Sequence, residues 1–566
     1  MALASKIRID IEGTEIKDFS DIFIRESIYS HHEFEVICRM DAFEKRDEFV
    51  MEQSKKYIGS AISISIELKK KGNSPILEHL FKGLITSIRT TKSYTGESDH
   101  VILAGYSPDI LLSDNPGCSS FENKSLKQIA DEILRPYPRD VIKSKIDPAK
   151  TDNLNYTVQY NESRYDFLRR LSTRYGEWFF YDSTQLFFGK LPEIKLDLKL
   201  GLDLTDFNFS ILMNPLNFKQ IAYDSSSAKT IEAASAKPGG KNNLNKYGGI
   251  AHDASMKEYN QQSKLLYNHL NVANNNYNKE LSDVVKLKED ASALSMSAMN
   301  GSSQNPKLKP GCKVNIKALK TGQSGDVDYG EYIITSIVHK CDNTMNYRND
   351  FEGIPAEAKV PDYTNPYAFP RCKTQNAVVK DNNDPDKLGR VRVSFFWQEN
   401  NMISPWIRPV NAYSGADRGF YFIPETGDEV LVGFEEEDAE KPYLIGSVYN
   451  GKNKPKASWP DKGNSFKGFI TKSNLKIEFD DKKKITTIET PEGNKVVLSD
   501  DQKSIIMQDQ NNNKVELSSN GIFMESMKDI RITSKSRITI EGTAGVDISS
   551  KADAKITGLN VDLNAN

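Results

Sequence analysis

The sequence predicts a mainly β protein that combines β-barrels with a C-terminal intertwined trimeric β-helix, or β-prism. Three observations predict this class. Short alternating strands recur through the first hundred residues, five short strands follow one another between residues 372 and 450, and the last segment repeats every eight residues. Clear helical patterns are confined to three stretches, near residues 126, 164 and 278.

The composition limits the classes of function. A chain of 566 residues implies several domains, and 38% hydrophobic with 27% charged residues is typical of a globular protein. The net charge of −3 gives no general reason to bind nucleic acid or an anionic membrane. The sequence contains no apolar run of about 18 residues and no signal-peptide pattern at its start. We expect a chain made in the cytoplasm, which another machine must move if it leaves the cell.

Residues 1–110 are expected to form a first β-barrel. Apolar and polar residues alternate in the stretches 7–11 and 62–66, and further strand-like stretches cover 81–88 and 101–106. The five cysteines are widely scattered along the chain, and no pair has the spacing of a metal or redox site. We therefore expect reduced, structural thiols rather than a disulfide framework.

Residues 111–190 are expected to be an α/β insertion. Ser125 and Gln128 form a capping box, and Ser163 can cap a second helix. The predicted buried faces of these two helices carry Leu126, Ile129, Ala130, Ile133 and Leu134 in the first and Phe167, Leu168, Leu171 and Tyr175 in the second. The aromatic run 177–181 suits a buried strand.

Residues 191–370 are expected to form a second β-barrel with a helical and loop insertion. Strands continue to about Tyr223, and residues 225–250 are rich in Ser, Ala, Asn and Gly, which predicts a loop or mobile insertion. A helix is predicted near residues 278–299. A strand at 330–338 closes the unit.

Residues 371–455 are expected to form a small barrel of the oligonucleotide/oligosaccharide-binding (OB) type. The predicted strands cover 389–395, 405–410, 420–424, 429–434 and 442–448. A linker at 450–464 joins this barrel to the tail, which we assign to residues 456–566.

The tail repeats in octads that begin at Asp529, Arg537, Gly545 and Asp553. Each octad has an apolar–polar–apolar triplet followed by small and polar residues, which predicts one short strand and a turn. A single-chain triangular β-helix needs about 18 residues per coil, so eight residues supply about one side. Three chains wound together would close the triangle, with these side chains pointing inward: Ile530, Ile532, Ile538, Ile540, Val546, Ile548, Ile556, Val561 and Leu563. An ordinary β-sandwich module is the alternative.

The 371–455 segment resembles the VgrG family of type VI secretion spike proteins. The matching residues run from Gly389 through Trp397, from Ser404 to Arg408 and from Arg418 to Phe434, and they end with Lys441-Pro442 and the stretch from Ile445 to Gly451. Stretches at 156–160, 308–316 and 347–355 also resemble the hub portion of the family.

The resemblance implies a hub of two related β-barrels, an OB adaptor and a needle. It also implies a homotrimer whose partners are a hexameric Hcp-like tube protein, a PAAR-like tip protein or effector, baseplate proteins and, transiently, the target membrane. Such a protein is cytoplasmic until assembly and is then exported by contraction. We expect neither a lysozyme domain before the needle nor a toxin domain after Asn566. The sequence does not separate type VI systems from extracellular contractile particles.

No catalytic, cofactor or metal site is expected, since the chain has no Gly-x-Ser-x-Gly, P-loop or His-Glu-x-x-His motif. Neighbours such as His31 and His32 point to opposite faces of a strand. The acidic stretches 381–386 and 435–438 fit polar turns better than calcium sites.

Two alternative functions stay open. One is a phage-type tailspike or cell-wall hydrolase with paired carboxylates. The other is a nucleic-acid binder that uses Arg390, Arg392, Trp397 and Trp406.

Overall fold

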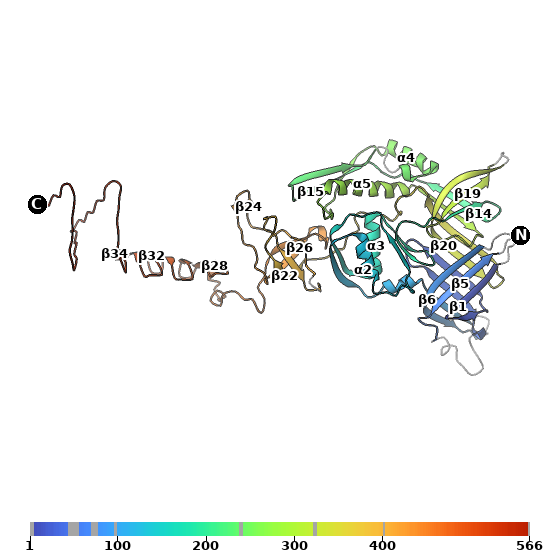
Figure 1. Cartoon of the computed structure of the whole chain (residues 1–566), viewed down its shortest axis with the longest axis horizontal. Helices are drawn as coiled ribbons and strands as arrows, with labels where there is room; N and C mark the ends of the chain where they lie inside the picture. Colours follow the sequence, from blue (N-terminus) through green and yellow to red (C-terminus); the bar gives the residue numbers. More distant parts are fainter. Residues whose placement is uncertain are drawn as a thin grey trace. The chain divides into compact units, whose positions relative to one another are not determined.

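The computed structural model describes residues 5–42, 56–68, 77–94, 99–236, 241–320, 325–399 and 402–563. The chain divides into two compact units, Met1–Val448 and Tyr449–Asn566. The first unit contains the helices and large sheets labelled in Figure 1. Among the described residues, no helix is long and apolar enough to cross a membrane. The prediction of a mainly β protein is confirmed.

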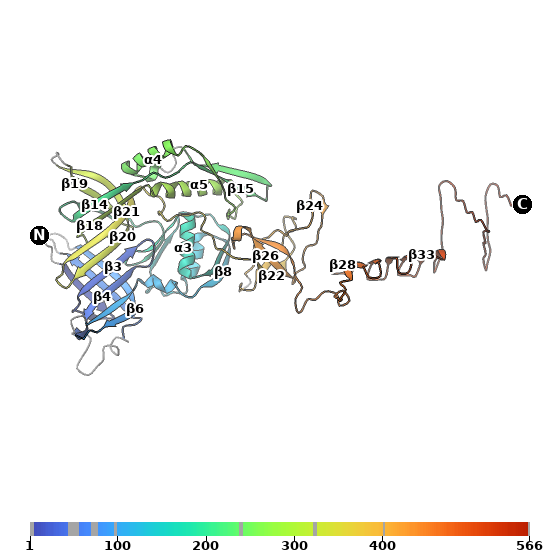
Figure 2. The ribbon, with the colours of Figure 1, turned by 180° about the vertical axis from the view of Figure 1, so that it is seen from behind.

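One 13-stranded sheet joins both ends of the hub segment. Its first part contains β1 (Ser5–Ile11), β2 (Thr14–Ile16), β3 (Asp21–Ser27), β4 (Glu33–Arg39), β5 (Ala61–Leu68), β6 (Leu77–Thr91) and β7 (His100–Tyr106). Its second part contains β13 (Lys195–Lys199), β14 (Leu204–Ile211), β18 (Ser297–Ser303), β19 (Lys313–Leu319), β20 (Asp326–Asp342) and β21 (Tyr347–Pro355). The antiparallel pair β3–β20 connects the two parts, and Figure 2 shows these strands side by side. The sheet is therefore continuous between the two segments that the sequence predicts as barrels.

The α/β insertion packs around two helices, α2 (Leu126–Leu134) and α3 (Arg164–Tyr175). The capping box of Ser125 and Gln128 is formed, and the Ser163 side chain accepts from the N–H of Asp166, so both predicted caps are confirmed. Its strands are β8 (Gly117–Lys124), β9 (Ser144–Asp147), β10 (Leu154–Glu162), β11 (Trp178–Tyr181) and β12 (Leu186–Gly189). A 3-10 helix, η2 (Pro108–Leu112), precedes them. All four residues of β11 are buried, as the aromatic run predicts.

The insertion between β14 and β18 is more ordered than the sequence suggests. The 225–250 stretch was predicted as a loop or mobile insertion. Parts of it form regular elements, so the prediction is wrong for those parts, and residues 237–240 lie outside the described residues. The elements here are β15 (Phe218–Asp224), β16 (Lys229–Ala234), η3 (Lys241–Asn243), α4 (Lys246–Glu258), β17 (Ser263–Leu266) and α5 (Tyr277–Leu294). Helix α4 was missed because its apolar pattern is weak, although Asn245 caps it by accepting from the N–H groups of Tyr247 and Gly248. Helix α5 ends at Leu294 rather than near 299, where β18 has already begun.

The small barrel contains four principal strands in the order β23-β22-β26-β27. They are β22 (Gln375–Asp381), β23 (Arg392–Phe395), β26 (Glu429–Phe434) and β27 (Pro442–Ser447), with a two-residue pair β24 (Ser414–Gly415) and β25 (Arg418–Gly419), and with η4 (Glu435–Glu437). The predicted strands 405–410 and 420–424 are wrong, since Ile407 and Pro409 make only isolated bridges and 420–424 is irregular. Strand β22, which lies in the middle of the sheet, was missed.

A buried ionic network joins the small barrel to the α/β insertion. Arg174 on α3 donates to Glu440 over 2.5 Å and to the carbonyl oxygen of His269 over 2.7 Å. His269 Nδ1 lies 2.8 Å from Asp438 Oδ2. Burial raises the pKa of the Glu440 carboxyl, although Arg174 lies beside it. A buried ion pair of this kind fixes the position of its elements because neither charge can be left alone.

We predict that Arg174→Met lowers the free energy of unfolding of the first unit by about 3–5 kcal/mol, because Glu440 loses its nearest positive charge inside the protein. Urea unfolding followed by tryptophan fluorescence measures the change. As a control, Lys127→Met removes an exposed pair with Asp131 and should cost no more than about 0.5 kcal/mol. Equal effects of the two substitutions would contradict the assigned role of the network.

Candidate functional site: the apolar face of the C-terminal unit

The C-terminal unit contains a seven-stranded antiparallel meander. Its strands are β28 (Phe466–Ile470), β29 (Lys476–Asp480), β30 (Ile485–Glu489), β31 (Lys495–Ser499), β32 (Ser504–Gln508), β33 (Lys514–Ser518) and β34 (Gly521–Glu525). Every strand has five residues and pairs with the next in sequence. Each connection contains, or is directly followed by, one residue with positive φ: Asn474, Lys484, Gly493, Lys503, Asn512 and Gly521. Glycine and asparagine adopt this conformation most readily.

The register places apolar side chains in two columns on one face of this meander, because directly paired residues share a face. One column is apolar at all seven positions: Phe469, Ile477, Ile488, Val496, Met507, Val515 and Met524. The neighbouring column contains Lys467, Phe479, Thr486, Leu498, Ile505, Leu517 and Ile522. The apolar face is the name we give to these two columns.

Nothing within the described unit covers the apolar face. Ile488 is 46% exposed, Leu498 45% and Met507 49%, values far from those of core residues. The opposite face is mixed, and its middle column includes Glu478, Thr487 and Glu516. A contiguous apolar patch of this length on a folded sheet marks an interaction surface.

The predicted inward residues continue from the apolar face. Ile530 lines the same groove as Val496, Met507 and Met524. Beyond β34, residues 526–563 contain no strand in the single chain, although one short strand per octad was predicted. All nine predicted side chains, from Ile530 to Leu563, are exposed, between 48% and 85%. The predicted strand in each octad is therefore not formed in the single chain.

His31 and His32 lie in the loop before β4 rather than in a strand as expected, and their side chains have different surroundings. The His32 ring is buried next to Glu26, whereas His31 Nδ1 lies 2.7 Å from Asp109 Oδ2 and His31 Nε2 lies 2.7 Å from Ser113 Oγ. The second arrangement has the order of a Ser–His–Asp triad, which sequence reasoning missed because the three residues come from separate segments. The Ser113 N–H, however, donates to the carbonyl oxygen of Ile110, so it is not free to stabilise an oxyanion.

Carboxylates in both acidic stretches accept hydrogen bonds or form ion pairs with other residues of the chain. Asp384 accepts from the backbone N–H groups of Asp386, Leu388 and Arg390, and from the Arg390 guanidinium, which holds the pKa of Asp384 well below its usual range. This is a polar turn, as predicted. In the second stretch, Glu436 accepts from Asn268 and Asp438 pairs with His269.

The residues considered for nucleic-acid binding are likewise engaged within the protein. Arg392 donates to the carbonyl oxygen of Ser404 and pairs with Glu122. The Trp397 ring stacks on Phe395, and its indole N–H donates to Gln375. The Arg392 guanidinium also lies over the Trp406 ring, 5.9 Å from its centroid. These contacts favour structural roles over a stacking platform for bases.

All five cysteines are free, as predicted. Burial raises the pKa of the Cys312 thiol to about 12 and that of the Cys341 thiol to about 11. Thiols with such pKa values are poor nucleophiles at neutral pH. These two cysteines therefore fill the core of the hub sheet.

Two family models match the first unit. The phage tail baseplate hub (GPD) model matches residues 25–190, and the type VI secretion system/phage-baseplate injector OB domain model matches residues 375–449. Among solved structures, a Francisella PdpA–VgrG complex in its lidded form has a TM-score of 0.54 at 10% identity. That match covers 92% of this chain and 80% of the other, and at this identity it shows the fold alone.

Curated relatives are similar over shorter stretches. The type VI secretion system spike protein VgrG5 of Pseudomonas aeruginosa is 29% identical over 184 residues, which cover 27% of this chain and 22% of the relative. VgrG1a of the same organism is 36% identical over 109 residues, 17% of each chain. The matches thus span about a fifth of the length of these relatives. Together with the two family models, they show that the chain is similar to the VgrG spike proteins of type VI secretion and to phage baseplate hub proteins.

Proposed function

We propose that this protein is a structural spike of a type VI secretion or related contractile injection system and that it acts as a homotrimer. The observation that carries the proposal is the exposed apolar face, which the exposed octads follow in the chain. The first unit of the same chain matches the hub and OB models of injection machines. The relatives with matching segments are named spike proteins. Both lines of evidence favour a mechanical rather than a chemical role.

Energetics support the need for partner chains. Full burial of one large apolar side chain contributes about 1.5–3 kcal/mol. A lone chain leaves both columns and the octads in water. It thereby loses a burial free energy larger than the roughly 5–15 kcal/mol that stabilises a typical domain. Further copies of the same chain are the natural cover, because exposed apolar residues recur both in the meander and in the octads that follow it.

Three copies are favoured over two by the length of the repeat. Eight residues supply one side of a triangular coil, and three such sides close it. Residues Ile530, Ile538 and Val546 would then lie near the axis at successive levels. In a closed prism each strand pairs with neighbours from other chains, so no edge is left to fray. A rod of this construction suits puncture of a membrane under load.

The remaining partners are inferred from the family relation. We expect a hexameric Hcp-like tube protein and baseplate proteins at the hub, and a PAAR-like tip protein or effector at the end of the tail. The target membrane would be contacted only transiently, during contraction. The chain would be cytoplasmic until assembly and would then be exported by contraction. Neither a cofactor nor nucleic acid is required by this scheme.

An enzymatic role is the alternative with a specific observation behind it, the Ser113–His31–Asp109 arrangement. We infer that this group is structural. The hydroxyl and the carboxylate hold the imidazole that fastens η2 to the loop before β4, and the Tyr165 ring packs on it at 3.8 Å between centroids. The N–H of Ser113 is already used, so a tetrahedral intermediate formed on its Oγ would lack that donor.

We predict that Ile540→Asp abolishes the trimer, because three carboxylates would meet on a dry axis and each buried charge costs several kcal/mol. Sedimentation velocity of the full chain measures the loss. Thr539→Asp is the matched control, since its side chain points away from the axis and should leave assembly intact. A trimer that persists in the Ile540 variant would contradict the inward assignment.

We predict that a fluorophosphonate probe does not label Ser113 and that purified protein does not hydrolyse peptidoglycan or glycans. Ser113→Ala should leave both measurements at the level of a buffer blank. Labelling of the unaltered protein that disappears in the Ser113 variant would establish a hydrolase instead. Glycan cleavage that persists in that variant would point to paired carboxylates elsewhere.

A further inference from the structure

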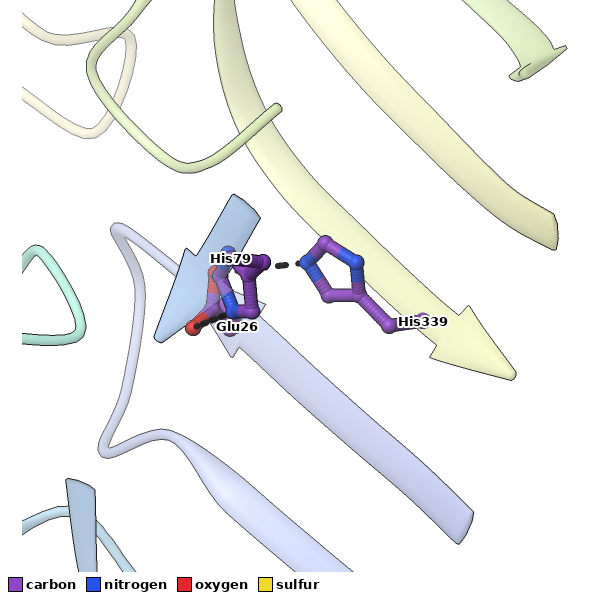
Figure 3. Close-up of side chains that lie close together, drawn as sticks. All are labelled: Glu26, His79 and His339. Atoms are coloured by element: carbon purple, nitrogen blue, oxygen red, sulfur yellow. Dashed lines mark ion pairs between the residues drawn. The ribbon is translucent and has the colours of Figure 1, made fainter. Parts of the chain in front are cut away.

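Four polar side chains meet in the buried interior of the hub. Glu26 lies on β3, His79 on β6 and His339 on β20, as Figure 3 shows. His32, just before β4, completes the group. Glu26, His32 and His339 are 1% exposed or less, and His79 is 3% exposed. We call these four residues the histidine cluster.

The fold brings the cluster together over long sequence distances. In the sheet order β3-β4-β7-β6, strands β3 and β6 are three steps apart, which is about 14 Å across a flat sheet. Yet His79 Nε2 lies 3.3 Å from Glu26 Oε1. The sheet is therefore strongly curled here, and these side chains point into its interior.

The nitrogen and oxygen atoms face one another without normal hydrogen bonds. His339 Nε2 lies 3.5 Å from Glu26 Oε2, and His32 Nδ1 lies 3.6 Å from Glu26 Oε1, both beyond the usual 2.7–3.2 Å. Five buried atoms have no hydrogen-bond partner: Glu26 Oε2, both ring nitrogens of His32, His79 Nε2 and His339 Nε2. Folded proteins leave few such atoms, and a concentration of them at one point needs an explanation.

The outer atoms of the cluster, by contrast, are held in place. His339 Nδ1 lies 2.6 Å from the Tyr347 hydroxyl, which also accepts from the Asn349 amide. The Ser183 hydroxyl donates to Glu26. One ring nitrogen of His339 is thus anchored while the other faces the carboxylate. Metal-binding histidines are oriented in this way.

We propose that Glu26, His79 and His339 bind a divalent first-row transition-metal ion, with zinc the best match to their chemistry. One ligand atom from each residue lies within 4.8 Å of the others. Ligands about 2.05 Å from a tetrahedral ion are about 3.3 Å apart. The His79 Nε2 atom lies 3.3 Å from Glu26 Oε1, and the His339 Nε2 atom lies 3.5 Å from the other carboxylate oxygen, Oε2. Imidazole and carboxylate ligands suit zinc, and the ion would offset the buried negative charge.

The ion would act as a structural cross-link. It would tie β3 and β6 of the first part of the 13-stranded sheet to β20 of the second part, close to the β3–β20 junction. His32 would orient the Glu26 carboxylate rather than bind the ion. The inference concerns the hub alone and does not depend on trimer formation by the tail.

Metal content tests the proposal directly. The full chain is produced in zinc-supplemented medium and desalted. Inductively coupled plasma mass spectrometry should then find one zinc ion per chain. After chelation, added Co²⁺ should give the intense visible bands of a tetrahedral site, and chelation should lower the Tm. Wild-type protein that holds no zinc and shows no cobalt bands would overturn the proposal.

Variants locate the site. His79→Gln and His339→Gln should lose stoichiometric zinc, whereas His32→Gln should retain it with about 10–100-fold weaker affinity. His252→Gln is the matched control, because His252 is fully buried but lies outside the cluster. Retention of zinc by both His79 and His339 variants would place the ion elsewhere and refute the assignment. Should a variant fail to fold, the cobalt spectrum of the wild type still decides.

Discussion

The architecture depends on one constraint, that the apolar face of the tail has no cover within its own chain. The seven strands are only five residues long, so each can present no more than two or three side chains to one side. In the two columns of the apolar face, the strand register pairs mostly apolar residues with one another. A sheet so narrow cannot fold back on itself to bury them, and the chain supplies no helix to do so among the described residues of this unit. In the proposed homotrimer, the other two chains supply this burial.

The first unit has the opposite character. Its sheets enclose hydrophobic cores, and the buried charges of Arg174 and Glu440 are paired with each other. The insertion, the small barrel and the loop after β17 meet at that network, which makes the hub a body with fixed internal geometry. The proposed spike needs both properties, a hub that keeps its shape and a tail that becomes rigid when it assembles. The proposed metal ion would add a third constraint inside the hub, where the two parts of the large sheet join.

Sequence reasoning predicted the parts whose signals are local. Helix caps such as Ser125 and Ser163 can be predicted from the sequence, because a cap needs only one side chain and a backbone N–H group a few residues later. The octads are visible because a period survives in the sequence. Helix α4 was not predicted, since its glycines and weak apolar pattern resemble a loop. Strands 405–410 and 420–424 were overpredicted because apolar alternation does not guarantee a neighbouring strand to pair with.

The histidine cluster could not be predicted from the sequence. Glu26, His79 and His339 are separated by long stretches, and no motif spacing links them. They meet only because the sheet curls and β20 pairs with β3. The same holds for His31, Asp109 and Ser113. Both groups show that a pattern search finds chemistry within one element, whereas chemistry between elements requires the fold.

The mass of the full chain in solution tests the central claim most directly. Light scattering coupled to size exclusion should give three times the 63.8 kDa of one chain at working concentrations. A folded, monodisperse single chain, with residues 466–563 protected from protease, would contradict the account.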